Sequence, residues 1–149
     1  MQKITTFLWF DSNAGEAVEF YTSVFQNSRI LSKNSVGGKL ISASFELEGQ
    51  EFIALNGGPQ FKFTEAISLF VKCSTQEEID EKWERLTADG GKESMCGWLK
   101  DKYGLSWQII PPVLMQYLGH KDPEKAKRAM EAMMKMKKIE IKKLEEAVS

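Results

Sequence analysis

Residues 66–91 read AISLFVKCSTQEEIDEKWERLTADGG and place a strand directly before a helix. The β-branched and aromatic residues favour a strand over 66–73. Thr75 and Glu78 then have the spacing of a capping box, which satisfies free backbone N–H groups where a helix begins. The helix is expected to continue to the glycine pair at 90–91. Its apolar stripe consists of Ile79, Trp83 and Leu86.

The same order of elements occurs earlier in the chain. Residues 4–10 are expected to form a strand, and Asn13 with Glu16 offers another capping box before a helix. Three more strands, separated by glycine-containing turns, are expected between residues 29 and 56. The helix has an apolar stripe made of Ala14, Ala17, Val18, Tyr21, Val24 and Phe25.

After the second helix, short strands are expected at 92–95, 97–101 and 105–110, and the proline pair that follows ends the sheet. The order β-α-β-β-β therefore occurs twice, with an offset of about 61 residues when Phe10 is aligned with Val71. We predict an α+β fold in which paired β-α-β-β-β modules form a curved open sheet, with helices at the C-terminus. Each module leaves one sheet face uncovered, so the concave side is a natural pocket.

Residues 120–149 differ from the rest of the chain in charge and pattern. They contain nine Lys or Arg and six Asp or Glu, a local charge of +3 against −4 for the remainder. Asp122 is expected to cap a helix with Pro123 at its first position, and a second short helix is expected after Glu140. We expect a solvated helix face and an apolar stripe docked on the sheet or on a partner subunit. The stripe contains Ala126, Ala129, Met130 and Met133.

The composition argues against several classes of function. The chain has 149 residues, which suits one domain, and its 20 basic and 21 acidic residues give no positive surplus for binding nucleic acid. The single histidine, His120, lies in a polar turn, which argues against metallohydrolase and serine-triad sites. Cys73 and Cys96 form neither a disulfide framework nor a zinc spacing. With no signal peptide or membrane span recognised, a cytoplasmic protein with reduced thiols and no membrane partner is expected.

Several motifs occur in order along the chain: FLWFD at 7–11, Phe20-Tyr21, ALNGGP at 54–59, CGWLxD at 96–101 and GxSWQIxP at 104–111. Together they resemble the PhnB-like proteins, also named the 3-demethylubiquinone-9 3-methyltransferase-like family. This family is a branch of the vicinal-oxygen-chelate superfamily, with glyoxalase I, bleomycin-resistance proteins and extradiol dioxygenases. The resemblance implies one glyoxalase-like domain over 1–149, usually in a homodimer. Its parts are a first module at about 3–58, a second at about 65–112 and a helical extension at about 121–149.

The resemblance also implies where a metal would bind. Superfamily enzymes hold a divalent metal with His, Glu or Gln on the first and last strands of each module, and Gln108 stands where metal-binding members usually have Glu. The aligned positions here are Ile4 or Thr6, Ala54 or Asn56, Ser68 and Gln108. Neutral amide and hydroxyl oxygens bind divalent metals weakly. We therefore expect no tightly held metal and no other cofactor.

A small-molecule-binding protein with an aromatic-lined cup is the expected function. Methyltransferase activity is not expected, because the glycine pairs match neither a dinucleotide-binding nor a phosphate-binding turn. No catalytic residue is assigned. Strand alternation and the shared motifs select a pocket lined by Thr6, Leu8, Phe10, Ala54, Asn56, Ser68, Phe70, Cys96, Trp98 and Gln108.

Two alternative functions remain open from the sequence. In the first, the protein is an enzyme that recruits a divalent metal weakly, or that positions a substrate with Gln108 and Cys96. A packed thiol is the simpler interpretation of Cys96, because no histidine lies nearby in the sequence to activate it. In the second, the methionine-rich C-terminal helix is the functional surface and the cup is vestigial.

Overall fold

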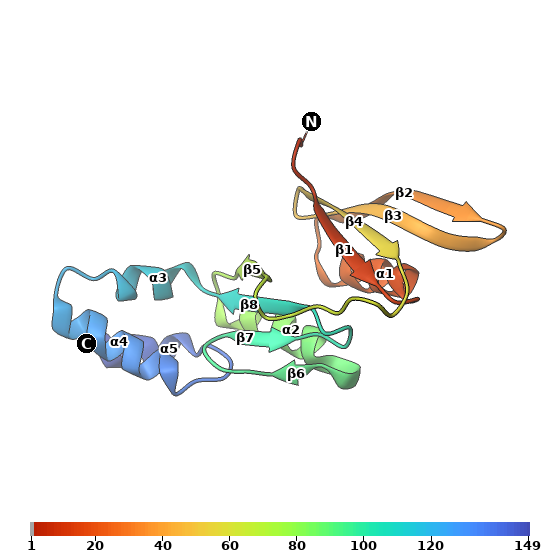
Figure 1. Ribbon diagram of the computed structural model, residues 1–149. Coiled ribbons are helices and arrows are strands. Elements are labelled where there is room, and N and C mark those ends of the chain that lie inside the picture. Colours follow the sequence, from red (N-terminus) through yellow and green to blue (C-terminus); the bar gives the residue numbers. More distant parts are fainter. Residues whose placement is uncertain (1) are drawn as a thin grey trace. The chain divides into compact units, whose positions relative to one another are not determined.

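A computed structural model describes residues 2–149. The chain divides into two compact units, the first ending at Phe63 and the second spanning Thr64–Ser149 (Figure 1). Each unit contains one four-stranded sheet and one helix in the order β-α-β-β-β, and three further helices complete the second unit. The predicted α+β class and the repeated module are confirmed. No helix within residues 2–149 has the length and hydropathy needed to cross a membrane.

The first unit has its sheet strands in the order β1-β4-β3-β2. β1 and β4 run parallel, and the other neighbours are antiparallel. The predicted strand near residue 29 is longer than expected, because it continues to Val36 and pairs with β3 along most of its length. The elements are β1 (Thr6–Phe10), α1 (Ala14–Val24), β2 (Ser28–Val36), β3 (Lys39–Leu47) and β4 (Gln50–Asn56).

Helix α1 covers one face of the first sheet through an aromatic core. The Tyr21 ring of α1 lies 6.5 Å from the Phe10 ring of β1 and 6.3 Å from the Phe45 ring of β3. Phe45 in turn stacks on Phe52 of β4, with 5.3 Å between ring centroids. All four side chains are at most 5% exposed. Such stacking adds about 0.5–1.5 kcal/mol per pair to the burial of the rings, so these contacts fix which sheet face α1 covers.

The beginning of α1 corrects one prediction. Asn13 precedes the helix, but its side chain makes no capping hydrogen bond. Instead, the Ala14 N–H donates to Asn56 Oδ1 over 2.8 Å, and Asn56 Nδ2 donates to the Leu40 carbonyl over 3.1 Å. The predicted capping box at Asn13 and Glu16 is therefore wrong, because the Asn13 side chain makes no capping bond, while an amide from the end of β4 satisfies the first N–H of α1.

The second unit repeats the order with shorter strands, arranged β5-β8-β7-β6. The predicted capping box before its helix is confirmed: the Glu78 N–H donates to Thr75 Oγ1 over 3.2 Å, and Glu78 Oε1 accepts from the Ser74 N–H over 3.0 Å. Residues 88–90 form a short 3-10 turn after the helix. The elements are β5 (Ser68–Lys72), α2 (Gln76–Thr87), β6 (Lys92–Glu93), β7 (Trp98–Lys100) and β8 (Ser106–Ile110).

The C-terminal extension adds α3 (Pro112–Leu118), α4 (Pro123–Met134) and α5 (Ile141–Val148). The sequence pattern does not predict α3, because the proline pair at 111–112 indicates the end of the sheet. Proline also suits the first turn of a helix, and α3 begins at Pro112. The predicted cap of α4 is confirmed, since the Glu124 N–H donates to Asp122 Oδ1 over 3.0 Å. The helices share a buried cluster made of Ile110, Leu114, Met136, Ile139 and Leu144.

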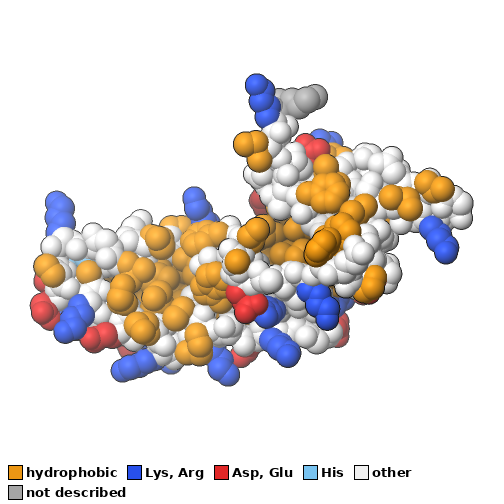
Figure 2. Space-filling view, in the orientation of Figure 1, with side chains coloured by type: hydrophobic (Ala, Val, Ile, Leu, Met, Phe, Trp, Pro, Cys, Tyr) orange, Lys and Arg blue, Asp and Glu red, His pale blue; other side chains and the backbone are white. Residues whose placement is uncertain are grey.

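The predicted apolar stripe of α4 is partly wrong. Ala129 is fully buried, whereas Met130 is 50% exposed. Met134 of α4 and Met115 of α3 are also exposed, and Figure 2 shows apolar side chains gathered over these two helices. The helix is therefore rotated so that Met133 and Ala132, rather than Met130, pack against the buried cluster.

Candidate functional site

Two rows of side chains lie across the second sheet on the face opposite Leu99 and Trp107. Backbone pairing places Phe70 of β5, Gln108 of β8 and Trp98 of β7 in one row. The adjacent row consists of Ser68, Ser106 and Lys100. Directly paired residues project on the same face of a sheet. We call these six residues, Ser68, Phe70, Trp98, Lys100, Ser106 and Gln108, the Gln108 face.

The centre of the Gln108 face is polar and partly enclosed. Gln108 Nε2 donates to Ser68 Oγ over 2.9 Å. The Ser68 hydroxyl accepts this bond and retains its own O–H to donate. Ser106 Oγ is buried and has no hydrogen-bond partner in the part of the chain that the structure describes. A buried hydroxyl without a partner is costly, so this face has hydrogen-bonding capacity that the described residues leave unused.

Aromatic and charged groups border this polar centre. Phe70 is 45% exposed and Trp98 is half-buried, so both rings are accessible. Lys100 Nζ pairs with Glu65 Oε1 at 2.8 Å, and this hydrogen bond lowers the pKa of the Glu65 carboxyl. The two opposite charges offset each other. The Gln108 face therefore combines two aromatic rings, an amide and hydroxyls, with little net charge.

The structure corrects the predicted pocket in the first unit. Leu8, Phe10 and Ala54 are at most 5% exposed and belong to the core, and Phe10 contacts Tyr21 of α1. Thr6 lies on the same face by strand alternation. These four residues therefore do not line an open surface of this unit. Strand alternation divides the residues of β1 and β4 between two faces of the sheet, but it does not say which face is open. The face predicted to line the pocket is the one that α1 covers.

The uncovered face of the first sheet has different chemistry. Phe7, Ile53 and Ser44 form one row across β1, β4 and β3, and Trp9, Leu55 and Ser42 form the next. The residues from β1 and β4 are apolar, while those from β3 are hydroxyls. Ser44 Oγ is already bonded to Ser32 Oγ, and Ser42 Oγ accepts from Asn34 Nδ2. We call these six residues, Phe7, Trp9, Ser42, Ser44, Ile53 and Leu55, the Phe7 face.

The ALNGGP motif after β4 supports Trp9 rather than a ligand. Trp9 Nε1 donates to the Gly58 carbonyl over 2.9 Å, and Phe61 meets the Trp9 ring edge-on at 4.9 Å. A Cβ atom at Gly57 would overlap the Trp9 ring. Asn56, predicted to line the pocket, caps α1 instead. Both features could have been inferred only from residues that lie more than 40 positions apart in the sequence.

Asp101 explains the spacing of the CGWLxD and GxSWQIxP motifs. Its carboxylate is 2% exposed and accepts three hydrogen bonds, from the Tyr103 and Leu105 N–H groups and from Trp107 Nε1, over 2.9, 3.1 and 2.9 Å. The carboxylate thus closes the turn between β7 and β8 and fixes the Trp107 ring. The sequence does not predict this role, because the pattern places Asp101 only at the end of an expected strand and in a shared motif.

The two cysteines lie in different environments. Both are free thiols. Burial raises the pKa of the Cys73 thiol to about 12, which keeps it protonated. Cys96 is half-buried in the loop before β7, where its backbone has a φ of 61°. His120 is exposed in its turn, as predicted, and its Nδ1 accepts from the Asp122 N–H over 3.0 Å.

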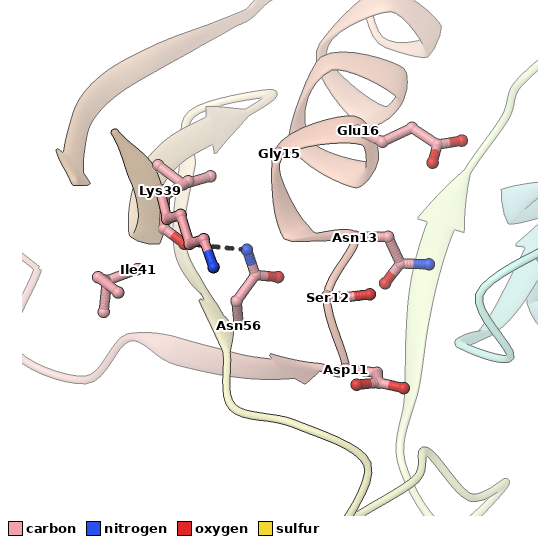
Figure 3. Close-up of a pocket in the computed structure, with 9 residues that line it drawn as sticks. Asp11, Ser12, Asn13, Gly15, Glu16, Lys39, Ile41 and Asn56 are labelled. Carbon is pink, nitrogen blue, oxygen red and sulfur yellow. Dashed lines mark hydrogen bonds between the residues drawn. The ribbon is translucent and has the colours of Figure 1, made fainter. Parts of the chain in front are cut away.

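A concave region lies at the beginning of α1 (Figure 3). Its volume is about 570 Å³. Asn56 points into it, but the amide is occupied by the Ala14 and Leu40 backbone, and the charged side chains are exposed. An open cavity with satisfied polar groups gives a ligand little to bind, so we do not assign the site there. It is lined by Asp11, Ser12, Asn13, Gly15, Glu16, Lys39, Leu40, Ile41 and Asn56.

The donor set of the Gln108 face does not fit a tightly bound divalent metal. Within residues 2–149, no group of three or more His, Cys, Asp or Glu side chains is placed to hold a metal ion. Ser68 and Gln108 supply only neutral oxygens. The corresponding strand of the first unit places Phe7 and Trp9 on its uncovered face. Divalent metals require stronger oxygen or nitrogen ligands, at least some of them anionic or imidazole.

The fold and the paired modules are those of a glyoxalase/bleomycin-resistance-like protein. The family model described as 3-demethylubiquinone-9 3-methyltransferase matches residues 2–110. The chain belongs to this family, the PhnB-like proteins. No curated protein matches the chain.

Solved structures agree with this classification. The PhnB protein from Bacillus cereus is 41% identical, with a TM-score of 0.69 over 74% of this chain and 99% of that chain. The fosfomycin resistance protein FosX from Listeria monocytogenes, solved with Mn(II) and sulfate, is 17% identical, with a TM-score of 0.58 over 80% of this chain and 98% of that one. A glyoxalase/bleomycin resistance protein from Albidiferax ferrireducens is 12% identical, with a TM-score of 0.50 over 74% and 98%. The last two similarities concern the fold alone.

Proposed function

We propose that the protein binds a small, flat aromatic molecule on the Gln108 face, without a tightly held metal. The observation that carries this proposal is the row Phe70, Gln108 and Trp98, which places an amide between two accessible aromatic rings. The Ser68 hydroxyl in the adjacent row accepts from Gln108 and retains its own O–H, which adds hydrogen-bonding capacity to the same surface.

The spacing of the row supports this class of ligand. Phe70 and Trp98 lie on strands separated by two interstrand steps, or about 10 Å between backbones. Aromatic rings stack or meet edge-on with centroids 4.5–7 Å apart, so one flat ring fits between or over them. The Gln108 amide can donate and accept, and the Ser68 hydroxyl can donate, which suits an uncharged hydroxyl, carbonyl or amide on the ligand.

The same chemistry favours binding over catalysis. The Gln108 face has one potential base, Lys100, and its ammonium is paired with Glu65. An acid or base needs a reachable proton and a pKa near the working pH. Methyl transfer would require a cofactor site, and the glycine turns match none of the nucleotide-binding patterns. Sequestration of a small molecule requires only the surface described above.

A titration with 2-naphthol, followed by amide NMR, tests the proposal. This probe has two fused flat rings and one hydroxyl group. We expect shifts centred on Phe70, Trp98 and the Gln108 side-chain amide, and roughly tenfold weaker binding for Trp98→Ala and for Gln108→Ala. Met115→Ala, which removes an exposed apolar side chain from α3, is the matched control and should bind normally. Shifts spread over the extension, with no response at Gln108, would reject the proposal.

A native mass spectrum of the protein, purified without added metal or chelator, reports both the bound metal and the number of subunits. We propose a metal-free homodimer, in keeping with the family resemblance. A stoichiometric metal, or 2-naphthol binding that requires added Mn(II), would instead favour an enzyme that recruits a metal. In that case Gln108→Glu should raise the affinity for Mn(II), because it adds an anionic oxygen ligand.

A further inference from the structure

The C-terminal extension lies outside the part of the chain that matches the family model, which ends at Ile110. Ile110 is two residues beyond Gln108 and therefore projects on the same face of β8. It is 3% exposed because it belongs to the buried cluster with Leu114, Ile139 and Leu144 of the extension. The extension is therefore packed against one end of the Gln108 face.

The extension also binds the loop that leads into Trp98. The Cys96 N–H donates to the Met136 carbonyl and the Gly97 N–H to the Lys137 carbonyl, both over 2.8 Å. On its other side, the Gly97 carbonyl accepts from the Ile109 N–H of β8 over 2.8 Å. Gly97 thus links residues 136–137 to the strand that carries Gln108, and Trp98 is the next residue in the chain.

The backbone at this link permits little movement. Cys96 and Gly97 both have positive φ angles, 61° and 84°. A Cβ atom at Gly97 would lie 2.6 Å from Ile110 Cδ1 and 3.0 Å from Ile139 Cγ1, so only glycine fits. A non-glycine residue such as Cys96 adopts a positive φ only at an energetic cost, which the surrounding contacts must offset.

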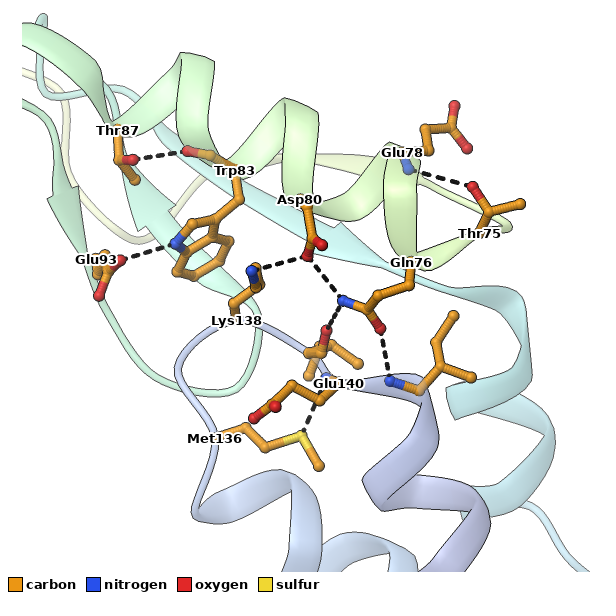
Figure 4. A network of polar contacts seen from close by, with 12 residues as sticks. Thr75, Gln76, Glu78, Asp80, Trp83, Thr87, Glu93, Met136, Lys138 and Glu140 are labelled. Carbon is orange, nitrogen blue, oxygen red and sulfur yellow. Dashed lines mark hydrogen bonds and ion pairs between the residues drawn. The ribbon is translucent and has the colours of Figure 1, made fainter.

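Gln76 of α2 holds residues 138–141 from the opposite side (Figure 4). Its Nε2 donates to the Ile139 carbonyl over 3.0 Å, and its Oε1 accepts from the Ile141 N–H over 2.8 Å. Asp80, one turn further along α2, accepts from Gln76 and pairs with Lys138 at 2.8 Å. The chain segment that contacts Gly97 is therefore fixed to the helix that covers the other face of the sheet.

We propose that the extension is a positioning element for the ligand site: through residues 136–139 and Gly97 it sets the place of Trp98, and so the shape of aromatic ligand that the Gln108 face accepts. The expected effect on ligand binding rests on the proposed function. The effect of the extension on the placement of Trp98 does not. Gln76 is the positioning residue, because it acts on Trp98 only through the extension.

The test uses full-length protein labelled with 5-fluorotryptophan, with the Trp98 resonance assigned from Trp98→Phe. Gln76→Ala is expected to shift or broaden the Trp98 fluorine resonance, to speed amide exchange at Cys96 and Gly97, and to weaken 2-naphthol binding severalfold. Arg128→Ala is the matched control, because it removes a contact inside the extension, from Arg128 Nε to the Ala147 carbonyl, that does not reach Gly97. Ile139→Ala is a second variant, which loosens the side chain beside Gly97.

The outcomes separate the two proposals. Faster exchange at Cys96 and Gly97 with an unchanged Trp98 resonance would overturn the positioning role. Unchanged exchange in both Gln76→Ala and Ile139→Ala would overturn it as well, since the link would not depend on these residues. If wild-type protein fails to bind 2-naphthol, the proposed function fails, while the fluorine spectra and the exchange rates still decide how Trp98 is held.

Discussion

The two units have the same order of elements but stabilise their sheets differently. In the first, β2 and β3 have nine residues each, and an aromatic core centred on Tyr21 joins the sheet to α1. In the second, β6 and β7 have only two and three residues. The shorter sheet depends on the buried Asp101 carboxylate and on the docked extension. A repeated module can therefore have shorter strands where other contacts replace the lost strand pairing.

The uncovered faces differ as well. The Phe7 face has apolar residues on β1 and β4, and its two hydroxyls, Ser42 and Ser44, are already bonded to Asn34 and Ser32 of β2. The Gln108 face has an amide between two aromatic rings and a buried hydroxyl without a partner. Polar groups that are satisfied internally gain nothing from a ligand, whereas unsatisfied ones do. This contrast is why we assign the ligand to the second unit.

The largest effect is expected from removing the Asp101 carboxylate. Asp101→Ala should lower the free energy of unfolding by about 3–5 kcal/mol, because it leaves the Trp107 and Leu105 donors buried without an acceptor. Asp101→Asn should cost less, since one acceptor oxygen remains. Urea unfolding measures both, with Glu84→Ala on the exposed side of α2 as the control. An equal loss for Glu84→Ala would show that the second sheet does not depend on this carboxylate.

A smaller loss is expected in the first unit from Gly57→Ala. The added methyl group must displace the Trp9 ring, which should cost about 1–3 kcal/mol and change the near-ultraviolet circular dichroism. Gly119→Ala is the control, because its methyl group would meet the Met115 carbonyl at an ordinary 3.4 Å. Its effect should stay within about 0.5 kcal/mol. If Gly57→Ala is equally mild, the ALNGGP motif does not hold Trp9 in the way described.

The contrast between the two faces is sharpened by a pair of phenylalanine variants. Phe70→Ala is expected to weaken 2-naphthol binding roughly tenfold, and Phe7→Ala less than twofold, because only Phe70 has a hydrogen-bonding amide beside it. Both side chains are about half exposed, 45% and 55%, so their removal should disturb the fold to a similar extent. NMR titration measures both affinities. A reversed ranking would move the ligand to the Phe7 face.

The smallest effect concerns the pH dependence of the contact between α2 and the extension. The hydrogen bond from Lys138, and then that from Gln76, lowers the pKa of Asp80. A carboxyl whose pKa is lowered by folding contributes its full stabilisation at pH values above the pKa of the unfolded state, about 3.9. This stabilisation is lost as the pH falls through the lower pKa of the folded state.

Asp80→Asn should therefore reduce stability at pH 7 by roughly 0.2–1 kcal/mol, as for an exposed ion pair, and the difference from wild type should fade below about pH 4. Urea unfolding between pH 3 and 7 measures this. Glu84→Gln, on the same helix, is the control and should show no such trend. A stability difference between wild type and Asp80→Asn that grows as the pH falls would contradict this prediction.

Predictions that depend on neighbouring residues succeeded where no distant group intervened. The Thr75 and Glu78 box and the Asp122 cap form as the spacing indicates, because each bond joins groups within a few residues. The Asn13 box does not form, and the first N–H of α1, that of Ala14, is satisfied instead by Asn56, 42 positions away. In the candidate site, strand register places Ser68, Phe70, Trp98 and Gln108 on one face. The corresponding choice in the first unit was wrong, because alternation does not say which face a helix covers.

The repeated β-α-β-β-β order and the resemblance to the family could be read from the sequence, since they follow from periodicity and from motifs in a fixed order. Only the tertiary structure decided that α1 covers Leu8 and Phe10, that Asn56 is a cap, that Asp101 closes a turn around Trp107, and that the extension is fixed to Gly97. Several of these outcomes join residues that lie far apart in the chain, as for Gly97 and residue 137. Such contacts depend on side-chain packing and backbone geometry in three dimensions, which no local pattern encodes.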